Sequence, residues 1–476
     1  MSTASQRIAA FAATLAFEDL PADTVAAAKL HALDALGCGL AGLAAGEGAF
    51  AVGAAREANC GGPATAIGIP GGLPAGEAAL LNGTLCHVLD FDDTHPDSVV
   101  HVSAAVTPAA IAAAEQAGRG GRELICALVL GNEVSTRLGM AAGGRFHARG
   151  LHPTGVCGVF GATASVARLR DLDAERTVHA IGIAGSMAGG LLEFLADGAK
   201  TKPLHPGWAA HAALAAVRLA AHGATGPASV LEGRRGFFAS YLHGEPVDVA
   251  AQFDDLGQRY ETPRIAFKPY PACHYTHAPI DALASLVERE GICAADVESI
   301  TALSDATGVG LVLDPLADKL RPRTAYDSKF SLPYCLASLL VRGSVDVSSF
   351  TAAAIEEEEV LELAARVDYE QRRYAAAPDA FPGGVRVRTR DGRTLEAELR
   401  QQRGGADNPL SSDEIVGKFR VNAAQALPDA AVAQLERSLL DLDGLATLAP
   451  LEILGEACEG IAAGADVGPA TLVRDA

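Results

Sequence analysis

Long apolar segments rich in alanine and glycine run through the first 265 residues and constrain the fold most strongly. In residues 21–43, apolar side chains recur every three or four positions, which is the period of an amphipathic α-helix. Residues 153–173 and 174–195 are apolar almost all round, and a helix without a polar face is typical of the centre of a bundle. Aromatic residues are only 5% of the chain, which favours closely packed helices over an aromatic-rich β-sandwich.

The pattern changes near residue 263. Residues 297–309 indicate a strand, and residues 384–400 alternate around Asp391-Gly392, which predicts a β-hairpin. The length of 476 residues exceeds that of one typical domain. We therefore predict a mainly α protein: a large all-α helical domain of residues 1–265 and 408–460, an inserted smaller α+β lid domain of residues 266–407, and a flexible tail of residues 461–476.

Charge and cysteine content narrow the function. Lys plus Arg is 38 and Asp plus Glu is 58, so the net charge is −20. This field repels nucleic acids and anionic membranes, although a local basic pocket can still bind a small anion. The nine cysteines form no CxxC pair, which is typical of reduced thiols in a cytoplasmic protein. Neither a signal peptide nor a membrane span is expected.

The common catalytic motifs are absent from the sequence. It has no GxxxxGK[ST], no strand-linked GxGxxG, no GxSxG and no HExxH, so phosphate-loop, dinucleotide-binding, nucleophile-elbow and zincin chemistry lose their usual support. Four polar blocks within apolar surroundings remain as candidates for a functional site.

The first block is DFDDTHPDSVVHVS, residues 90–103. It permits three interpretations: a solvated loop that caps a helix, a cation site built from Asp and His, or an acid/base site in which carboxylates orient imidazoles. Calcium-loop spacing is absent, because Pro96 occupies the middle of the block. The flanking segments look buried, and buried charges must be paired.

The other three blocks carry cations and histidines. Residues 145–158 contain Arg149 and a helix that begins at His152. The free N–H groups at the start of a helix attract anions. The alternative is a surface loop with incidental cations. Residues 197–213 contain two lysines and His205 at a second helix start, which suits a carboxylate or, alternatively, an exposed lysine pair. Residues 267–281 lie at the predicted domain junction, where pockets form.

Together the blocks supply histidines, lysines and carboxylates without a nucleophile motif. This inventory suits removal of a proton next to a carboxylate and delivery of a proton elsewhere. A metal-dependent hydrolase built on the Asp/His loop is an alternative, and a non-catalytic carboxylate-binding protein is another.

The same blocks resemble the MmgE/PrpD family from about residue 5 to residue 455. The family includes 2-methylcitrate dehydratase, cis-aconitate decarboxylase and iminodisuccinate epimerase. The resemblance implies a helical domain with an inserted α+β lid, a homodimer, and catalysis without metal or organic cofactor. The blocks that carry it are LDFDDTHPD with HVSAAVTPAAIAAAE, GLHPTGVCGVFGATASVARL, KTKPLHPGWAAHAALAAVRLA, FKPYPACHYTHAPIDA and SKFSLPYCLA.

The resemblance also implies particular site residues. Many relatives carry arginine where this chain has His274, and the dehydratases and decarboxylases often carry tryptophan directly after the motif threonine. The matching positions are Asp90, Asp93 and Thr94 of DFDDT, His101 after it, His152 of G-x-H-x-T-G, Lys202 of K-P-L-H and His277 of the junction T-H.

We expect a small di- or tricarboxylate to bind between the two domains. His101 or His152 would remove a proton next to a carboxylate, while Asp90 and Asp93 orient the imidazoles. Dehydration is the favoured outcome, with decarboxylation and epimerisation as alternatives, and no metal or cofactor is expected. The predicted catalytic residues are His101, His152, Asp90, Asp93, Lys202 and His277, and the predicted substrate-binding residues are Thr94, His274, Lys200, His205 and Arg149.

Overall fold

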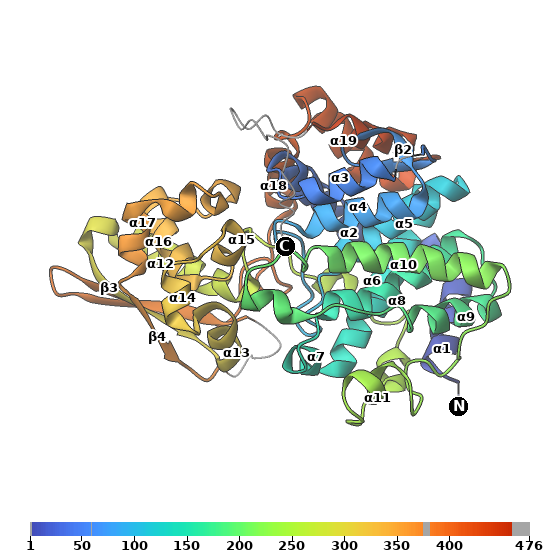
Figure 1. Ribbon diagram of the computed structural model, residues 1–476, viewed down its shortest axis with the longest axis horizontal. Coiled ribbons are helices and arrows are strands. Elements are labelled where there is room, and N and C mark those ends of the chain that lie inside the picture. Colours follow the sequence, from blue (N-terminus) through green and yellow to red (C-terminus); the bar gives the residue numbers. More distant parts are fainter. Residues whose placement is uncertain (1, 59, 375–380, 459–476) are drawn as a thin grey trace, which may run out of the picture.

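The computed structural model describes residues 2–58, 60–374 and 381–458. Figure 1 shows a larger helical part beside a smaller part in which helices lie against a sheet. The larger part encloses the main hydrophobic core, to which the chain contributes both before residue 268 and after residue 414. The smaller part has a separate core, built mostly from residues 272–387. The prediction of a mainly α protein is confirmed, whereas the predicted domain limits stay predictions. The predicted tail, residues 461–476, lies outside the described residues.

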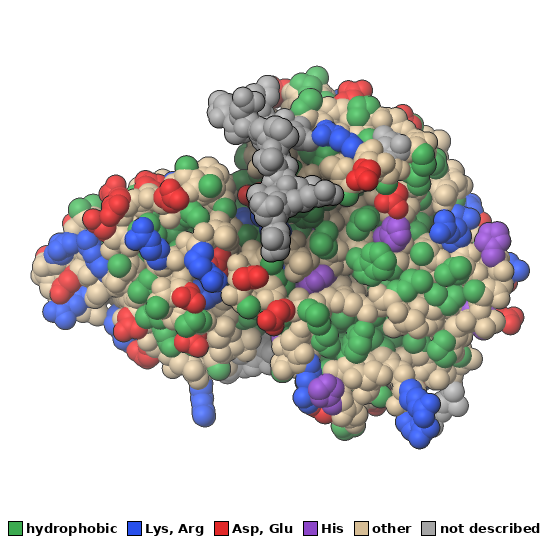
Figure 2. Space-filling model, in the orientation of Figure 1, with side chains coloured by type: hydrophobic (Ala, Val, Ile, Leu, Met, Phe, Trp, Pro, Cys, Tyr) green, Lys and Arg blue, Asp and Glu red, His purple; other side chains and the backbone are tan. Residues whose placement is uncertain are grey.

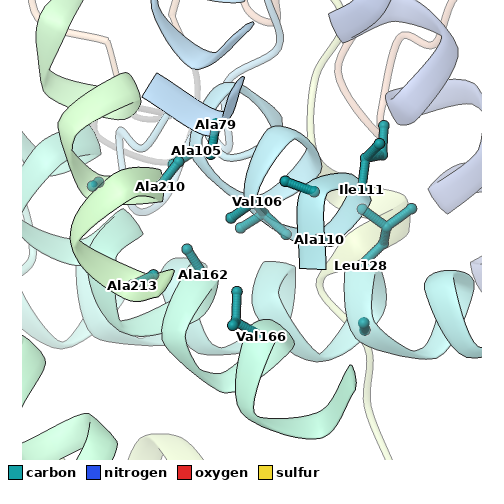
Figure 3. Packing of buried hydrophobic residues seen from close by; sticks show 14 of the residues in the cluster. Ala79, Ala105, Val106, Ala110, Ile111, Leu128, Ala162, Val166, Ala210 and Ala213 are labelled. Atoms are coloured by element: carbon teal, nitrogen blue, oxygen red, sulfur yellow. The ribbon is translucent and has the colours of Figure 1, made fainter. Parts of the chain in front are cut away.

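Small side chains bring the helices of the larger part close together. Figure 3 shows Ala79, Ala105, Ala162 and Ala210 pointing toward one another from neighbouring helices, with Val106 and Val166 beside them. The helices are α1 (Ala4–Thr14), α2 (Ala22–Ala44), α3 (Ala49–Glu57), α4 (Ala75–His87), α5 (Ser103–Ala117), α6 (Gly121–Ala142), α7 (Arg145–Ala148), α8 (Pro153–Leu169), α9 (Ala174–Ala184), α10 (Leu204–Ala221), α11 (Phe237–Tyr241), α18 (Ser412–Ala423) and α19 (Asp429–Leu440).

Helices α6 and α8 touch through their backbones. A Cβ atom added to Gly161 of α8 would collide with the carbonyl oxygen of Gly131 and with the Ser135 hydroxyl, both on α6. The sequence places glycine at these contact points, so the two helices approach without a side chain between them.

The C-terminal helices complete the larger part. Helix α18 packs against α2, and the ammonium of Lys418 lies 2.7 Å from a carboxylate oxygen of Asp34. Lys418 also donates to the carbonyl of Phe91 at 2.7 Å. Because Asp34 is buried, its charge needs this partner, which ties the end of the chain to the second helix.

One prediction for the larger part is wrong in detail, because this part is not all-α. Strands β1 (Ala64–Ala66) and β2 (Ile69–Leu73) form an antiparallel pair. Side chains of neighbouring helices bind the edge of this pair: Glu115 accepts from the backbone and hydroxyl of Thr65, and Asn82 bonds to the backbone on both sides. Strands this short show no measurable alternation in the sequence.

The smaller part contains a four-stranded sheet in the order β4-β3-β5-β6. Its hairpin around Asp391-Gly392 is confirmed, with Gly392 at φ +90°. The strand expected at residues 297–309 is shorter than predicted: it spans Val297–Ser304, and a short helix follows at Ala306–Gly308. Residues 367–371 form a strand parallel to β3. The strands are β3 (Val297–Ser304), β4 (Val367–Gln371), β5 (Gly383–Thr389) and β6 (Thr394–Leu399).

Helices cover this sheet and fill the space toward the larger part (Figure 1). Pro333 lies in the first turn of α16, where its missing N–H costs no hydrogen bond. Figure 2 shows acidic and basic side chains intermixed over the smaller part. The helices are α12 (His277–Glu290), α13 (Ala306–Gly308), α14 (Leu316–Leu320), α15 (Ala325–Ser328), α16 (Leu332–Arg342) and α17 (Glu358–Ala364).

Among the described helices, α6 is long and apolar enough to cross a membrane. The pair α2 and α3 would pass the same test together, although it is bent by 90° at its break. In this fold 89% of the apolar window of α6 is buried, as in the central helix of a bundle.

Replacing Gly161 tests the backbone contact between α6 and α8. Gly161→Ala should lower the free energy of unfolding by about 1–3 kcal/mol, because the added methyl group has no room. Gly53→Ala in α3 is the matched control, since nothing lies within 4 Å of its added Cβ, and it should stabilise by roughly 0.5–1 kcal/mol. Urea titrations of both variants measure the difference, and an unchanged Gly161→Ala would contradict the close packing.

Candidate active site

A cavity of about 60 Å³ lies where the two parts meet. It is small beside the roughly 300–1,000 Å³ of most small-molecule sites. We call it the first cavity. Its polar lining comes from four separate segments of the chain, and its apolar lining from the smaller part, the loop before α10 and Val99 of the loop after α4. The lining residues are Asp90, Thr94, Val99, His101, His147, His152, Leu192, Phe194, Leu195, Lys202, Lys268, Cys273, His274, Tyr275, Leu311, Phe330 and Phe381.

Asp90 is the centre of the charge cluster in the first cavity. One of its carboxylate oxygens lies 3.0 Å from the ammonium of Lys202 and 2.8 Å from that of Lys268. Burial alone would raise the pKa of Asp90, but the two ammonium groups and nearby histidines hold it well below its usual range. One carboxylate and two ammonium groups leave a net charge of +1, which suits a bound anion.

The backbone of the loop after α4 is strained where it carries this carboxylate. Asp90 has φ 53° and Val99 has φ 55°, a left-handed conformation that a β-branched residue rarely adopts. Such positions cost about 1–3 kcal/mol each and persist where the surroundings hold them. Lys268 supplies part of that hold, because it also donates to the Asp90 carbonyl at 2.9 Å.

His101 is positioned by the same loop. Its Nδ1 lies 3.1 Å from the Thr94 hydroxyl and 3.5 Å from a carboxylate oxygen of Asp92. Its Nε2 lies 3.9 Å from Asp90, so this nitrogen is left to face the cavity. Burial lowers the pKa of His101 to about 4, although Asp92 opposes the shift. The imidazole is therefore neutral at pH 7 in the empty site.

His152 stands at the start of α8, and its ring centroid lies 6.1 Å from that of His101. Its Nδ1 lies 3.0 Å from Nδ1 of His205, so one of these two nitrogens carries the proton that the other accepts. Burial lowers the pKa of both rings, to about 4 for His205 and well below the usual value for His152. His205 is half-buried, so the pair connects the cavity with the surface.

His274 and His277 occupy different surroundings. His274 lines the cavity and stacks on Phe381, and within the described residues neither of its ring nitrogens has a hydrogen-bond partner. His277 lies behind it, where Nε2 donates to the Ala272 carbonyl at 3.1 Å. Burial lowers the pKa of His277 to about 3. His274 is thus available to a ligand, whereas His277 supports the segment that carries it.

Asp93 faces away from the first cavity. Its carboxylate lies 2.8 Å from Nδ1 of His31 and accepts hydrogen bonds from the backbone and hydroxyl of Ser103. The His31 ring in turn stacks on Phe267. These contacts hold the loop against α2 and α5, so Asp93 acts on the site through the position of the loop.

Lys200 and Arg149 lie outside the cavity lining. Lys200 is half exposed and lies 2.7 Å from a carboxylate oxygen of Glu47. Arg149 pairs with Glu245 on the surface. The structure thus brings Asp90, Thr94, His101, His152, Lys202 and His274 into one cavity, keeps His205 and His277 directly behind it, and leaves Lys200 and Arg149 at the surface.

Three residues of the site were missed by the sequence analysis. Lys268 was quoted within the junction block but assigned no role, and its signal is a lone lysine among apolar residues and prolines. His87 and Asp92 form a buried pair, with Nδ1 to carboxylate distances of 2.8 and 2.9 Å. The pKa of Asp92 is held well below its usual range, because His87 and His101 outweigh burial.

Four of these groups are close enough together to be considered as a metal site. Donor atoms of His87, Asp90, Asp92 and His101 all lie within 4.8 Å of one another. The ammonium groups of Lys202 and Lys268 beside Asp90 would repel a divalent cation, and Asp92 already binds His87. The arrangement therefore suits an anion better than a cation.

Two buried ammonium groups and neutral histidines around one cavity, set between a helical bundle and a mixed sheet, are groups typical of an acid/base enzyme. The MmgE/PrpD N-terminal domain model matches residues 6–250, and the MmgE/PrpD C-terminal domain model matches residues 270–442. The chain belongs to the MmgE/PrpD family, and the prediction of a lyase of this type is confirmed.

Several curated relatives carry the same kind of name. The human cis-aconitate decarboxylase is 31% identical over 389 residues, which is 78% of each chain. The cis-aconitate decarboxylase-like protein oryM of Aspergillus oryzae is 28% identical over 91% of this chain and 93% of its own. The cis-aconitate decarboxylase of Aspergillus terreus is 27% identical over 94% and 95%, respectively.

Substitution of Lys202 or of Lys200 tests which of these two ammonium groups binds a carboxylate ligand. Lys202→Met should weaken binding of tricarballylate, an unreactive saturated tricarboxylate, by about 10- to 150-fold, because a charge-assisted hydrogen bond contributes roughly 1.5–3 kcal/mol. Lys200→Met is the matched control and should bind like the wild type, since that ammonium pairs with Glu47. Calorimetric titration measures both, and equal losses in the two variants would contradict this assignment.

Proposed function

We propose that this protein is a decarboxylase of cis-aconitate, or of a closely similar unsaturated tricarboxylate, that works without metal or organic cofactor. The main support for this activity is the first cavity, where two ammonium groups around Asp90 lie beside the neutral imidazoles of His101 and His152. The names of the relatives supply the substrate. Dehydration, which the sequence analysis favoured, and epimerisation use the same groups and stay alternatives.

The reaction requires charge stabilisation and one proton. When the carboxylate on the saturated carbon of cis-aconitate leaves as CO₂, its bonding electrons form a new double bond to the central carbon. The electrons of the original double bond move to the outer carbon, which lies next to another carboxylate, and a proton adds there. The product is a dicarboxylate with a terminal methylene group.

Lys202 and Lys268 suit the carboxylates that remain. Negative charge develops on the outer carbon and spreads into its carboxylate, where an ammonium group already in place stabilises it. Leu195, Phe194 and Leu311 line the apolar side of the cavity. A carboxylate placed there loses its hydration, which favours departure as neutral CO₂.

His101 and His152 are the candidate proton donors. Each is neutral in the empty cavity, because burial lowers its pKa, and the negative charges of a bound tricarboxylate favour the imidazolium. The donor can then protonate the outer carbon. The Nδ1 contact between His152 and His205 gives His152 a route for recovering a proton from the surface.

Entry of the substrate requires a wider cavity. About 60 Å³ is too little for a tricarboxylate, so the smaller part would move as a lid that opens for binding and closes for reaction. Trp208 and Leu219, exposed on α10 at 48% and 46%, offer a surface for the expected homodimer. A cytoplasmic location stays a prediction.

Proton NMR in D₂O tests the reaction. Purified protein with cis-aconitate should yield CO₂ and a terminal-methylene dicarboxylate that carries one deuterium. His101→Ala and His152→Ala should each lower kcat/KM by about 10²–10⁴-fold, the usual contribution of a positioned acid or base. His222→Ala, at an exposed position after α10, is the control. Water addition, a diastereomer change or unaltered cis-aconitate would each contradict decarboxylation, and a near-normal rate excludes that histidine as the donor.

Proton uptake on binding tests the electrostatics. Because the pKa of His101 is lowered to about 4, the ring is unprotonated at pH 6.5, and a bound trianion raises that pKa. Tricarballylate binding at pH 6.5 should therefore take up protons, and the uptake should decline as the pH rises above the pKa in the complex. Calorimetry in buffers of different ionisation enthalpy measures the number of protons taken up per ligand bound. His101→Asn should reduce it, and proton release by the wild type would contradict the interpretation.

A further inference from the structure

A second cavity, of about 900 Å³, lies at the same junction between the two parts. Its walls come from the turn after α2, the loop after α4, the segment between α16 and α17, and helix α18. We call it the second cavity. The lining residues are Ala45, Glu47, Leu89, Phe91, Pro269, Lys329, Asp346, Val347, Ser348, Phe350, Thr351, Ala352, Gly417, Lys418, Val421, Asn422 and Gln425.

The two cavities share a wall. Three short segments present adjacent residues to opposite sides of it, so the chain itself separates the two spaces. Asp90, Lys268 and Phe330 line the first cavity, whereas Leu89, Phe91, Pro269 and Lys329 line the second.

Lys329 brings an unmatched positive charge to the second cavity. Its side chain is 2% exposed, donates to the Pro271 carbonyl at 3.0 Å, and lies 4.4 Å from the centre of the Phe350 ring. Among the described residues, no carboxylate forms an ion pair with it. A buried ammonium group without a counter-ion is costly, and an anion in the cavity would offset that cost.

The other charged groups of the second cavity already have partners. Lys418 pairs with Asp34 at 2.7 Å, and Glu47 pairs with Lys200 at 2.7 Å. Asp346 accepts hydrogen bonds from the backbone and hydroxyl of Ser348 and from a further serine hydroxyl. Asp346 keeps its negative charge but is exposed to solvent, so Lys329 is the buried charge of the second cavity that has no ion-pair partner among the described residues. Burial lowers the pKa of Lys329 to about 8, which still leaves it mostly protonated at pH 7.

Apolar side chains form much of the remaining wall. Leu89, Phe91, Val347 and Phe350 line the interior, and Val421 is 69% exposed. We propose that the second cavity binds a small monoanion with an apolar body, such as a medium-chain carboxylate, whose head group pairs with Lys329. This ligand differs in class from a tricarboxylate, which has no apolar body to fill such a space.

Octanoate is the probe, with neutral octanamide as its control, and binding is measured by calorimetry on the full-length protein. Octanoate should bind saturably, and octanamide should bind at least about tenfold more weakly, because it lacks the charge-assisted hydrogen bond. Lys329→Met should lower octanoate affinity by about tenfold or more. Lys202→Met, a matched loss of a buried lysine in the first cavity, should leave octanoate affinity unchanged.

Several results would overturn the proposal. They are the absence of saturable octanoate binding, equal affinity for octanamide, unchanged affinity in Lys329→Met, and displacement of octanoate by tricarballylate, which would place octanoate in the first cavity.

Val421 supplies a second test if Lys329→Met does not fold. Its exposure allows substitution, and Val421→Asp places a negative charge beside the cavity, whereas Val421→Asn is its uncharged match. The Asp variant should bind octanoate more weakly than the Asn variant, with octanamide affinity equal in both. Equal octanoate affinities would count against an anion site.

Discussion

The contact on which the rest of the site depends is that of one buried carboxylate with two buried ammonium groups. Asp90, Lys202 and Lys268 come from three distant segments, and each would be a costly unpaired charge without the others. Their contact fixes the loop that carries His101, the turn before α10 and the chain as it enters the smaller part. The strained backbone at Asp90 persists because of the same contact. The stability of the loop and the proposed recognition of the substrate thus rest on the same charges.

Much of the fold could be predicted from the sequence, because local patterns determine it. The apolar period of 3.6 residues locates the long helices, and Asp391-Gly392 locates the hairpin, since the turn needs a residue with positive φ. The failures are short strands. Strands β1 and β2 are held by Glu115 and Asn82, which are distant in sequence, and β4 forms only because β3 offers an edge for pairing.

The sequence identified the segments that form the candidate site more reliably than the individual side chains that line it. Polar residues within apolar surroundings indicated the right segments, but the sequence does not say which side of a loop faces the cavity. Asp92 and Asp93 are neighbours, yet one contacts His101 and the other binds His31. In the same way, Lys200 lies at the surface whereas Lys202 lies in the cavity. Lys268 was overlooked because its role depends on a carboxylate 178 positions earlier in the chain.

The packing of α18 against α2 affects how the protein is made. Synthesis on the ribosome proceeds from the N-terminus, so α2 emerges long before the helix that covers it. Until residue 418 has left the ribosome, Asp34 lacks its ammonium partner and the apolar face of α2 around Gly37 lacks Phe419. The larger part therefore stays incompletely packed at α2 while the whole smaller part is translated. A chain that ends before residue 412 would lack α18 and would leave this face of α2 uncovered.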